Sequence, residues 1–239
     1  MKIALIGYGA MGKLIDQLAV ERRHKVPVVI EGTDAGLSAT QLSEKLEGVA
    51  AVIDFTVAAA VRRNVEACMM AQVPVVVGTT GWLDQKSDIE KLVSDAGGAL
   101  VYGANFSIGV NLFYKIAAYA AKLFAKFPEY EAFIEEQHHS RKKDAPSGTA
   151  LKIEEIVSNK LFGEDADEGV RVPIAATRAG NIPGTHRVGF DGPADQILLT
   201  HTARSREGFA LGAVIAAEWI VDKKGFFEFT DVVDQTLKR

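Results

Sequence analysis

The side chains best suited to chemistry lie in one run, Glu135-Glu136-Gln137-His138-His139-Ser140-Arg141-Lys142-Lys143-Asp144-Ala145-Pro146-Ser147-Gly148-Thr149. From His138 to Lys143, five of the six residues are basic or can become so, although the whole chain has a formal net charge of −4. Histidine is the residue best able to donate a proton near neutral pH, and a lysine among other cations can share that task. The run therefore indicates an anionic substrate and a proton donor.

The end of this run offers a second place for an anion. Ser147, Gly148 and Thr149 start a predicted helix, and their backbone N–H groups and hydroxyls suit a negatively charged group. Two such places close together indicate a small dicarboxylate. The alternative is a solvated basic turn with Ser147 as an ordinary N-cap. We expect no metal, because adjacent histidines diverge on a strand, and Cys68 and the carboxylates show no ligand spacing.

A glycine-rich turn directly follows the first predicted strand and opens the first predicted helix, with the sequence Gly7-Tyr8-Gly9-Ala10-Met11-Gly12. In that setting Gly7 allows the tight turn, Gly9 the approach of a pyrophosphate, and Gly12 the close packing of helix on strand. The diphosphate would lie at the helix N-terminus. The turn therefore predicts a dinucleotide cofactor, and the alternative is a glycine turn without a ligand.

Glu31 ends the second predicted strand, where a carboxylate can accept hydrogen bonds from the adenosine ribose. No Arg or Lys follows it to pair with a 2′-phosphate, and Lys13 is the nearby cation that could do so. NADH is therefore favoured over NADPH, unless Glu31 is a plain solvated carboxylate. The remaining cofactor contacts are expected at three other strand ends, namely Asp54-Phe55-Thr56, Gly78-Thr79-Thr80-Gly81 and Gly103-Ala104-Asn105-Phe106-Ser107. Phe55 or Phe106 could cover a ring face.

The elements that carry these motifs alternate in the first half of the chain, in the pattern of parallel strands joined by crossover helices. Each predicted strand is nearly all apolar, as expected when helices cover both faces of the sheet. The fold class is α/β, a Rossmann-type doubly wound parallel sheet. The predicted strands are Lys2–Ile6, Val26–Ile30, Ala50–Phe55, Pro74–Gly78 and Ala99–Gly103, and the predicted helices are Met11–Glu21, Ala39–Leu46, Ala58–Met70, Leu83–Ala96 and Val110–Phe127.

After Pro128 the order changes to α+β, which indicates an inserted second domain. It contains predicted strands at Tyr130–Gln137, His186–Asp191 and Gln196–Ala203, a helix at Thr149–Leu161, and a Gly/Pro-rich stretch between them. The tail holds a helix, Ala210–Val221, and a short closing element, Phe226–Leu237. We expect residues 1–106 and 210–239 to form the dinucleotide-binding domain, and 107–209 the domain for substrate binding and tetramerisation.

Composition excludes several functional classes. The negative net charge argues against nucleic acid and anionic membranes as partners. No apolar run approaches the roughly 20 residues of a membrane helix. Cys68 is the single cysteine, and the start Met1–Ile6 is too short for a signal peptide, so we expect a cytoplasmic protein.

The run Glu136-Gln137-His138-His139, with Lys142 and the following Asp144 to Ala150, closely resembles the signature of the dihydrodipicolinate reductase family of lysine and diaminopimelate biosynthesis. The resemblance extends to the glycine turn and to the runs Asp54–Thr56, Gly78–Gly81, Asn105–Gly109, Gly184–His186, His201–Arg206 and Phe209–Ala213. It implies reduction of 4-hydroxy-tetrahydrodipicolinate, a cyclic dicarboxylate, to tetrahydrodipicolinate with NADH or NADPH, in a cytoplasmic homotetramer.

The resemblance also implies roles for individual residues. His138 is similar to the family's proton donor and Lys142 to its second proton donor, while substrate contacts would come from His139, Ser147, Gly148 and Thr149. Cofactor contacts would come from Gly7, Tyr8, Gly9, Ala10, Met11, Gly12, Glu31, Gly78, Thr79, Thr80, Gly103, Ala104, Asn105 and Phe106. Much of the family has Arg in place of Ala10 and a basic residue in place of Gly32, and both departures favour NADH.

Two other functions fit the same architecture. An amino-acid dehydrogenase acting on aspartate would share the cofactor domain but lack the two-histidine signature. A nucleotide-sensing regulatory module would bind nucleotide without turnover, and it would leave the basic cluster unexplained.

Overall fold

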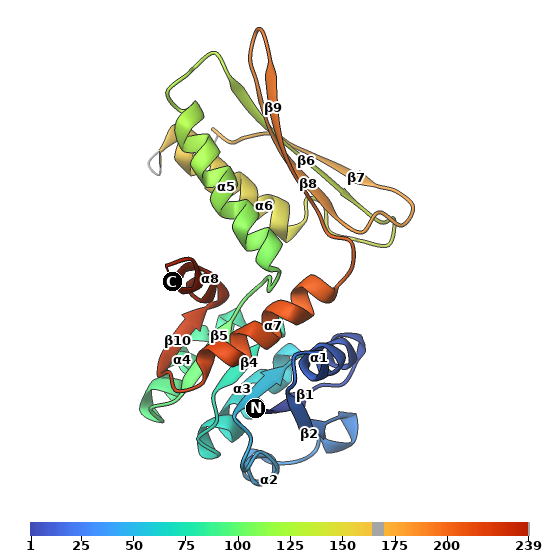
Figure 1. Ribbon diagram of the computed structural model, residues 1–239, viewed down its shortest axis with the longest axis vertical. Coiled ribbons are helices and arrows are strands. Elements are labelled where there is room, and N and C mark those ends of the chain that lie inside the picture. The colour runs from blue at the N-terminus through green and yellow to red at the C-terminus, as the bar shows by residue number, and fades with distance from the viewer. Residues whose placement is uncertain (164–169, 239) are drawn as a thin grey trace. The chain divides into compact units, whose positions relative to one another are not determined.

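The computed structural model describes residues 1–163 and 170–238, which form two compact units (Figure 1). The first unit consists of Met1–Ile108 and Arg206–Arg239, and the second of Gly109–Ser205. Each unit has its own sheet and its own buried cluster of apolar side chains. Among the helices in the described ranges, none has both the length and the apolar content needed to cross a bilayer.

The first unit contains a parallel six-stranded sheet in the order β10-β5-β4-β3-β1-β2. Its strands are β1 (Lys2–Ile6), β2 (Lys25–Ile30), β3 (Ala51–Asp54), β4 (Val75–Val77), β5 (Ala99–Tyr102) and β10 (Gly225–Glu228). Every residue of β3 and β4 is buried, because helices lie on both faces. The predicted doubly wound sheet is confirmed, and its order reverses direction between β1 and β3, where such sheets bind ligands.

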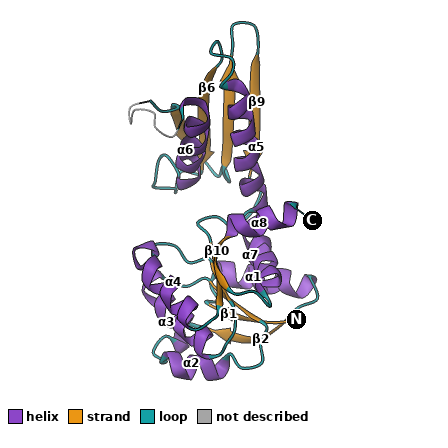
Figure 2. Cartoon of the chain, turned by 90° about the vertical axis from the view of Figure 1, so that its left-hand side faces the viewer, coloured by secondary structure: helices purple, strands orange, loops and turns teal. Residues whose placement is uncertain are grey.

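The helices of the first unit lie in two layers. Figure 2 shows α2 (Ala39–Lys45), α3 (Ala58–Met70) and α4 (Lys86–Asp95) on one face of the sheet, and α1 (Ala10–Glu21) and α7 (Glu207–Ile220) on the other. Two short 3₁₀ turns, Gly32–Asp34 and Leu83–Gln85, follow strands β2 and β4.

The single closing element predicted at 226–237 is instead a strand and a helix. β10 pairs in parallel with β5, and α8 (Phe229–Leu237) begins immediately after it. The break lies at Glu228, because this residue is the N-cap of α8 and forms a reciprocal capping box with Asp231. The tail thus adds a sixth strand to the sheet.

The second unit pairs two helices with a mixed sheet in the order β7-β6-β8-β9. Its strands are β6 (Glu131–His138), β7 (Ile174–Arg178), β8 (Thr185–Asp191) and β9 (Gln196–Thr202), and its helices are α5 (Ile108–Phe124) and α6 (Gly148–Phe162). Phe113, Ile153 and Phe190 belong to the buried cluster that joins helices and sheet. Strand β7 was not predicted, because it is a largely exposed edge strand without a continuous apolar run.

Strand register in the second unit brings together the residues of the candidate site. Glu136 and His138 are two residues apart on β6, so they lie on the same face of the sheet. Antiparallel pairing places His186 of β8 opposite Glu136, and parallel pairing places Arg178 of β7 beside His138. Four polar residues from three strands therefore meet near one end of this sheet.

Candidate active site

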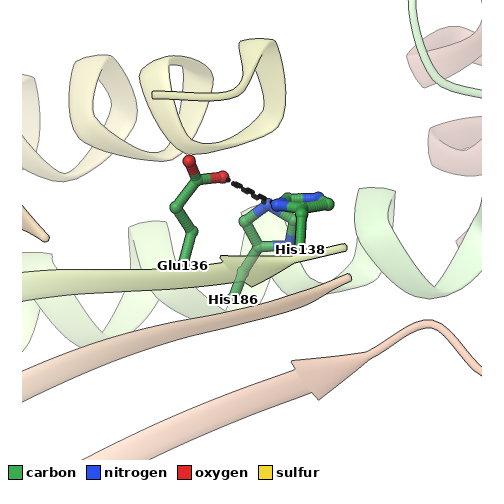
Figure 3. A group of neighbouring side chains, drawn as sticks. All are labelled: Glu136, His138 and His186. Carbon is green, nitrogen blue, oxygen red and sulfur yellow. Dashed lines mark ion pairs between the residues drawn. The ribbon is translucent and has the colours of Figure 1, made fainter. Parts of the chain in front are cut away.

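The centre of the site is the carboxylate of Glu136, which points toward His138 and His186 (Figure 3). Glu136 is fully buried. Its Oε1 accepts hydrogen bonds from the backbone N–H of Ser147 at 3.0 Å and from Nη2 of Arg178 at 2.6 Å. Its Oε2 lies 3.2 Å from Nδ1 of His138 and 3.7 Å from Nε2 of His186. Burial raises the pKa of Glu136, but the bonds from Ser147 and Arg178 outweigh burial, so the net pKa is lowered and the group is ionised.

Burial is the main influence on the pKa values of the two histidines of the cluster, His138 and His186. Burial lowers the pKa of His138, and the negative charge of Glu136 partly opposes that effect. For His186, burial and the neighbouring His138 lower the pKa to about 4. His186 is therefore neutral near neutral pH, and its 3.7 Å approach to Glu136 is a polar contact without a full ion pair.

Ser147 anchors the predicted anion-binding turn to this cluster. It is the N-cap of α6, and its Oγ accepts from the backbone N–H of Ala150 at 3.2 Å. The same Oγ lies 3.2 Å from Nε2 of His186, and the side chain is buried. Gly148 and Thr149 form the first turn of α6 beside it. In the structure, Ser147 and His138 therefore both contact the carboxylate of Glu136. Their order in the sequence does not reveal this shared contact.

The cationic loop between β6 and α6 carries Lys142 and His139. Nζ of Lys142 lies 2.9 Å from Oδ1 of Asp144, and this bond lowers the pKa of Asp144. Arg178 also donates to the carbonyl of Asp144 at 2.6 Å, which ties the loop to β7. Nδ1 of His139 is buried and has no hydrogen-bond partner within the described residues.

The same three side chains, Glu136, His138 and His186, have donor atoms within 4.8 Å of one another. Such a set could hold a metal ion, whereas the sequence pattern offers only His138 with His139 as candidate ligands. The guanidinium of Arg178 already balances the charge of Glu136, and this disfavours a second cation at the carboxylate. A metal-free site therefore stays the prediction.

In the first unit, the glycine turn has the geometry that a dinucleotide requires. Gly7 has φ +93°, and a Cβ on Gly7 or Gly12 would overlap a backbone carbonyl. At Gly9, by contrast, no atom lies within 4 Å of an added Cβ. The turn borders a cavity of about 310 Å³ lined by Gly9, Ala10, Met11, Gly12, Phe55, Thr56, Gly78, Thr79 and Thr80. A pyrophosphate at the start of α1 fits this open backbone.

A buried network supports the strand ends around this cavity. Oδ1 of Asp54 accepts from the hydroxyls of Thr56 at 2.7 Å and Thr79 at 3.2 Å, and Oδ2 accepts from Asn64 at 2.9 Å. The backbone N–H of Thr56 donates to Oγ1 of Thr79 at 2.7 Å. Burial raises the pKa of Asp54. Asn64, on α3, carries no sequence signal that would have assigned it to this site.

The other predicted cofactor residues occupy different surroundings. Glu31 is exposed and directly follows β2. It lies next to the glycine turn, because the N–H of Gly7 donates to the carbonyl of the preceding residue, Ile30. Tyr8 of the turn donates to Asp16. Gly103, Ala104 and Asn105 follow β5, where Oδ1 of Asn105 accepts from the N–H of Ser107 at 2.9 Å.

Phe106 is enclosed. The residue is 2% exposed, with ring centroids 4.7 Å from Phe229 and 6.2 Å from Phe55. A ring so enclosed is poorly placed to cover a nicotinamide, and a cofactor contact of Phe106 stays a prediction. Phe55, which lines the cavity, is the aromatic residue that can cover a ring face.

Comparison with known proteins places this arrangement in a family. Two family descriptions match the chain, "Dihydrodipicolinate reductase, N-terminus" over residues 1–106 and "Dihydrodipicolinate reductase, C-terminus" over residues 109–233. The 4-hydroxy-tetrahydrodipicolinate reductase of Christiangramia forsetii is 40% identical over 244 residues and covers 100% of both chains. That of Archaeoglobus fulgidus is 38% identical over 263 residues, with 98% of this chain and 100% of its own covered.

The fold is similar to that of a dipicolinate-bound dihydrodipicolinate reductase from Paenisporosarcina sp. TG-14. The TM-score is 0.79 at 22% identity, and the match covers 97% of this chain and 99% of the other. Matches to both halves of the sequence, and full-length relatives near 40% identity, agree with the two-histidine signature and the glycine turn. The chain belongs to the dihydrodipicolinate reductase family.

Proposed function

We propose that this protein reduces 4-hydroxy-tetrahydrodipicolinate to tetrahydrodipicolinate with NADH or NADPH, a step of lysine and diaminopimelate biosynthesis. The relatives at 40% and 38% identity carry the name of this reductase. Within the structure, the observation that carries the proposal is the pair of contacts that the Glu136 carboxylate makes. One buried carboxylate there contacts a candidate proton donor, His138, and the start of the helix suited to a substrate carboxylate.

His138 supplies the proton that accompanies reduction of the substrate. A bound nicotinamide cofactor supplies the hydride. Proton donation from His138 requires its charged form, which Glu136 favours and burial disfavours. Lys142 assists by holding a substrate carboxylate and supporting proton transfer. Its present partner, Asp144, is 57% exposed, so a substrate carboxylate can replace that ion pair at small cost.

The substrate class is a small dicarboxylate. His139, Ser147, Gly148 and Thr149 provide contacts to one carboxylate at the start of α6, where the helix dipole favours negative charge. Lys142 attracts the other. The Paenisporosarcina relative is bound to dipicolinate, which is also a dicarboxylate. The chain's net charge of −4 and its localised cations fit a small anion better than a nucleic acid.

The cofactor is a pyridine nucleotide, and we propose a preference for NADH. The open backbone at Gly9 and the start of α1 would hold the pyrophosphate. Glu31 would accept bonds from the ribose hydroxyls and repel a 2′-phosphate. Positions 10 and 32 are Ala and Gly, so neither position supplies a cation that could pair with a 2′-phosphate. Gly78, Thr79 and Thr80 would contact the nicotinamide side, together with the backbone of Gly103, Ala104, Asn105 and Phe106.

The second unit, proposed to bind substrate, is also proposed to form the subunit contacts of a homotetramer. Ile197 and Leu198 on edge strand β9 are 47% and 45% exposed, and Tyr119 of α5 is 65% exposed. Apolar side chains exposed together commonly mark protein interfaces. A cytoplasmic location is proposed because Cys68, the single cysteine, is a buried free thiol.

The direct test is turnover. The purified protein is mixed with NADH or NADPH and with the product of a dihydrodipicolinate synthase, and cofactor oxidation is followed by absorbance. Oxidation with a lower KM for NADH supports the proposal. Reduction of NAD⁺ or NADP⁺ with aspartate, without turnover of the synthase product, instead supports the dehydrogenase alternative. Cofactor binding without oxidation under all conditions supports a nucleotide-sensing module and overturns the reductase assignment.

A further inference from the structure

Glu136 has contacts that the role of His138 alone does not explain. The family signature contains the histidines and the lysine, and the structure places a fully buried carboxylate among them. A buried charge is costly unless it is paired and hydrogen-bonded. Oε1 meets that need, with bonds from Ser147 and Arg178.

The second oxygen, Oε2, faces the histidines. It lies 3.2 Å from Nδ1 of His138, and neither atom makes a hydrogen bond of good geometry within the described residues. Nε2 of His186 lies 3.7 Å from the same oxygen. Because His186 is neutral near neutral pH, the position of Oε2 acts mainly on His138. The carboxylate therefore has one oxygen held firmly and one directed at a single ring nitrogen.

The opposite edge of the His138 ring is kept open by a glycine. A Cβ added to Gly184 would stand 3.2 Å from Nε2 and 3.4 Å from Cδ2 of His138. Gly184 has φ +132°, a conformation that other residues rarely adopt. The ring is thus bordered by a carboxylate at Nδ1 and by the one residue type without a side chain at Nε2.

We propose that Glu136 is a positioning residue, which holds the His138 ring with Nδ1 toward Oε2 so that Nε2 carries and releases the proton. This inference rests on the proposed function. A carboxylate next to one imidazole nitrogen keeps the proton there and leaves the other nitrogen to react. In each turnover the proton leaves Nε2 for the substrate, and Nε2 is reloaded from solvent.

The charges around His138 show why the carboxylate is needed. Lys142 and His139 from the loop, Arg178 from β7 and His186 from β8 all surround the ring. Among the groups in the described part of the chain that act on it, only Glu136 favours its charged form. Without the Glu136 carboxylate, burial and the neighbouring cations would lower the pKa of His138 further, so the ring would stay neutral down to a lower pH than it does now. A protonated donor would then be scarce at the pH of the reaction.

The test compares Glu136→Gln with Glu135→Gln. Glu135 is the adjacent residue on β6, and its 42% exposed side chain pairs with Arg187, away from the cluster. We expect Glu136→Gln to lower kcat by roughly 100-fold, at the low end of what a positioned general acid contributes, with KM changed only a few-fold. The fall of kcat with rising pH should move to lower pH. Glu135→Gln should match the wild type in all three readouts.

Separate outcomes overturn the two proposals. A Glu136→Gln variant with wild-type kcat and pH profile overturns the positioning role, whereas an inactive wild type overturns the proposed function. A measurement on the wild type covers the case in which the variant does not fold or the wild type is inactive. Nitrogen NMR, with His138 assigned by comparison with His138→Gln, should show the neutral ring protonated at Nδ1. A proton on Nε2 instead would overturn the positioning role.

Discussion

Gly184 lies against the Nε2 edge of His138, where an added Cβ would be 3.2 Å from the nitrogen. This contact joins two segments of the second unit, the end of β6 and the residue that precedes β8. It means that the reactive edge of the proposed proton donor depends on the absence of a side chain at Gly184.

The substitution Gly184→Ala tests this relationship. We expect kcat/KM to fall at least about 10-fold, because the methyl group would displace the ring, and stability to fall by roughly 1–2 kcal/mol, because φ is positive. Gly180→Ala is the matched control. Gly180 also has a positive φ, +48°, but no atom lies within 4 Å of its added Cβ. It should lose stability and keep kcat/KM, and equal losses of activity in both variants would refute the contact argument.

Lys142 is expected to matter for both binding and turnover. In Lys142→Ala, we expect a higher KM and a much lower kcat, because the cation that attracts a substrate carboxylate and supports proton transfer is removed. Lys143→Ala removes a neighbouring exposed cation and should leave both constants close to wild type. Steady-state kinetics of the three proteins decide the matter. Near-normal turnover in Lys142→Ala would identify Lys142 as a surface charge.

Stability should fall as the pH drops below neutrality. His186 has a pKa lowered from 6.5 to about 4 in the folded protein, so protonation favours the unfolded state. The contribution of neutral His186 to stability is fully present above pH 6.5 and is lost as the pH falls toward 4. At about 1.36 kcal/mol per pKa unit, the loss is on the order of 3 kcal/mol. The lowered pKa of Glu136 acts in the same direction, at lower pH.

Urea unfolding of the wild type and of His186→Gln, at a series of pH values between neutrality and about 4.5, measures this loss. The variant should be less stable near neutral pH and should show a shallower decline with falling pH. If its stability fell as steeply as that of the wild type, the titration of His186 would not be the cause.

Metal removal should have no effect. Glu136, His138 and His186 resemble a donor set, but Arg178 is bonded to the carboxylate at 2.6 Å. Dialysis against a chelator should therefore leave kcat and KM unchanged, and added zinc should not raise activity. Activity that is lost on chelation and restored by zinc would show that the three residues form a metal site.

Local patterns were enough to predict most of the first unit. Continuous apolar runs mark β1 to β5, and the glycine spacing marks the turn before α1. The missed strand, β7, is largely exposed and lies at a sheet edge, so it lacks such a run. The boundary at Glu228 was missed because it depends on a capping box and not on hydrophobic period.

Only those members of the candidate site that are close in sequence could be proposed from the sequence. His138 and Ser147 lie in one run, and the chemistry of that run singles them out as candidates. His186 and Arg178 come from β8 and β7, and only strand register brings them to Glu136. The alternation of Glu136 and His138 along β6 was a usable signal, since it places both on one face of the sheet.

The most direct test of the account is the kinetics of His138→Gln beside the wild type, with NADH and the product of a dihydrodipicolinate synthase. The wild type should oxidise NADH. The variant should bind substrate with a KM within a few-fold of wild type, while kcat falls by about 10²–10⁴-fold, the contribution of a positioned general acid. A raised KM with an unchanged kcat would contradict the assignment of His138 as the proton donor.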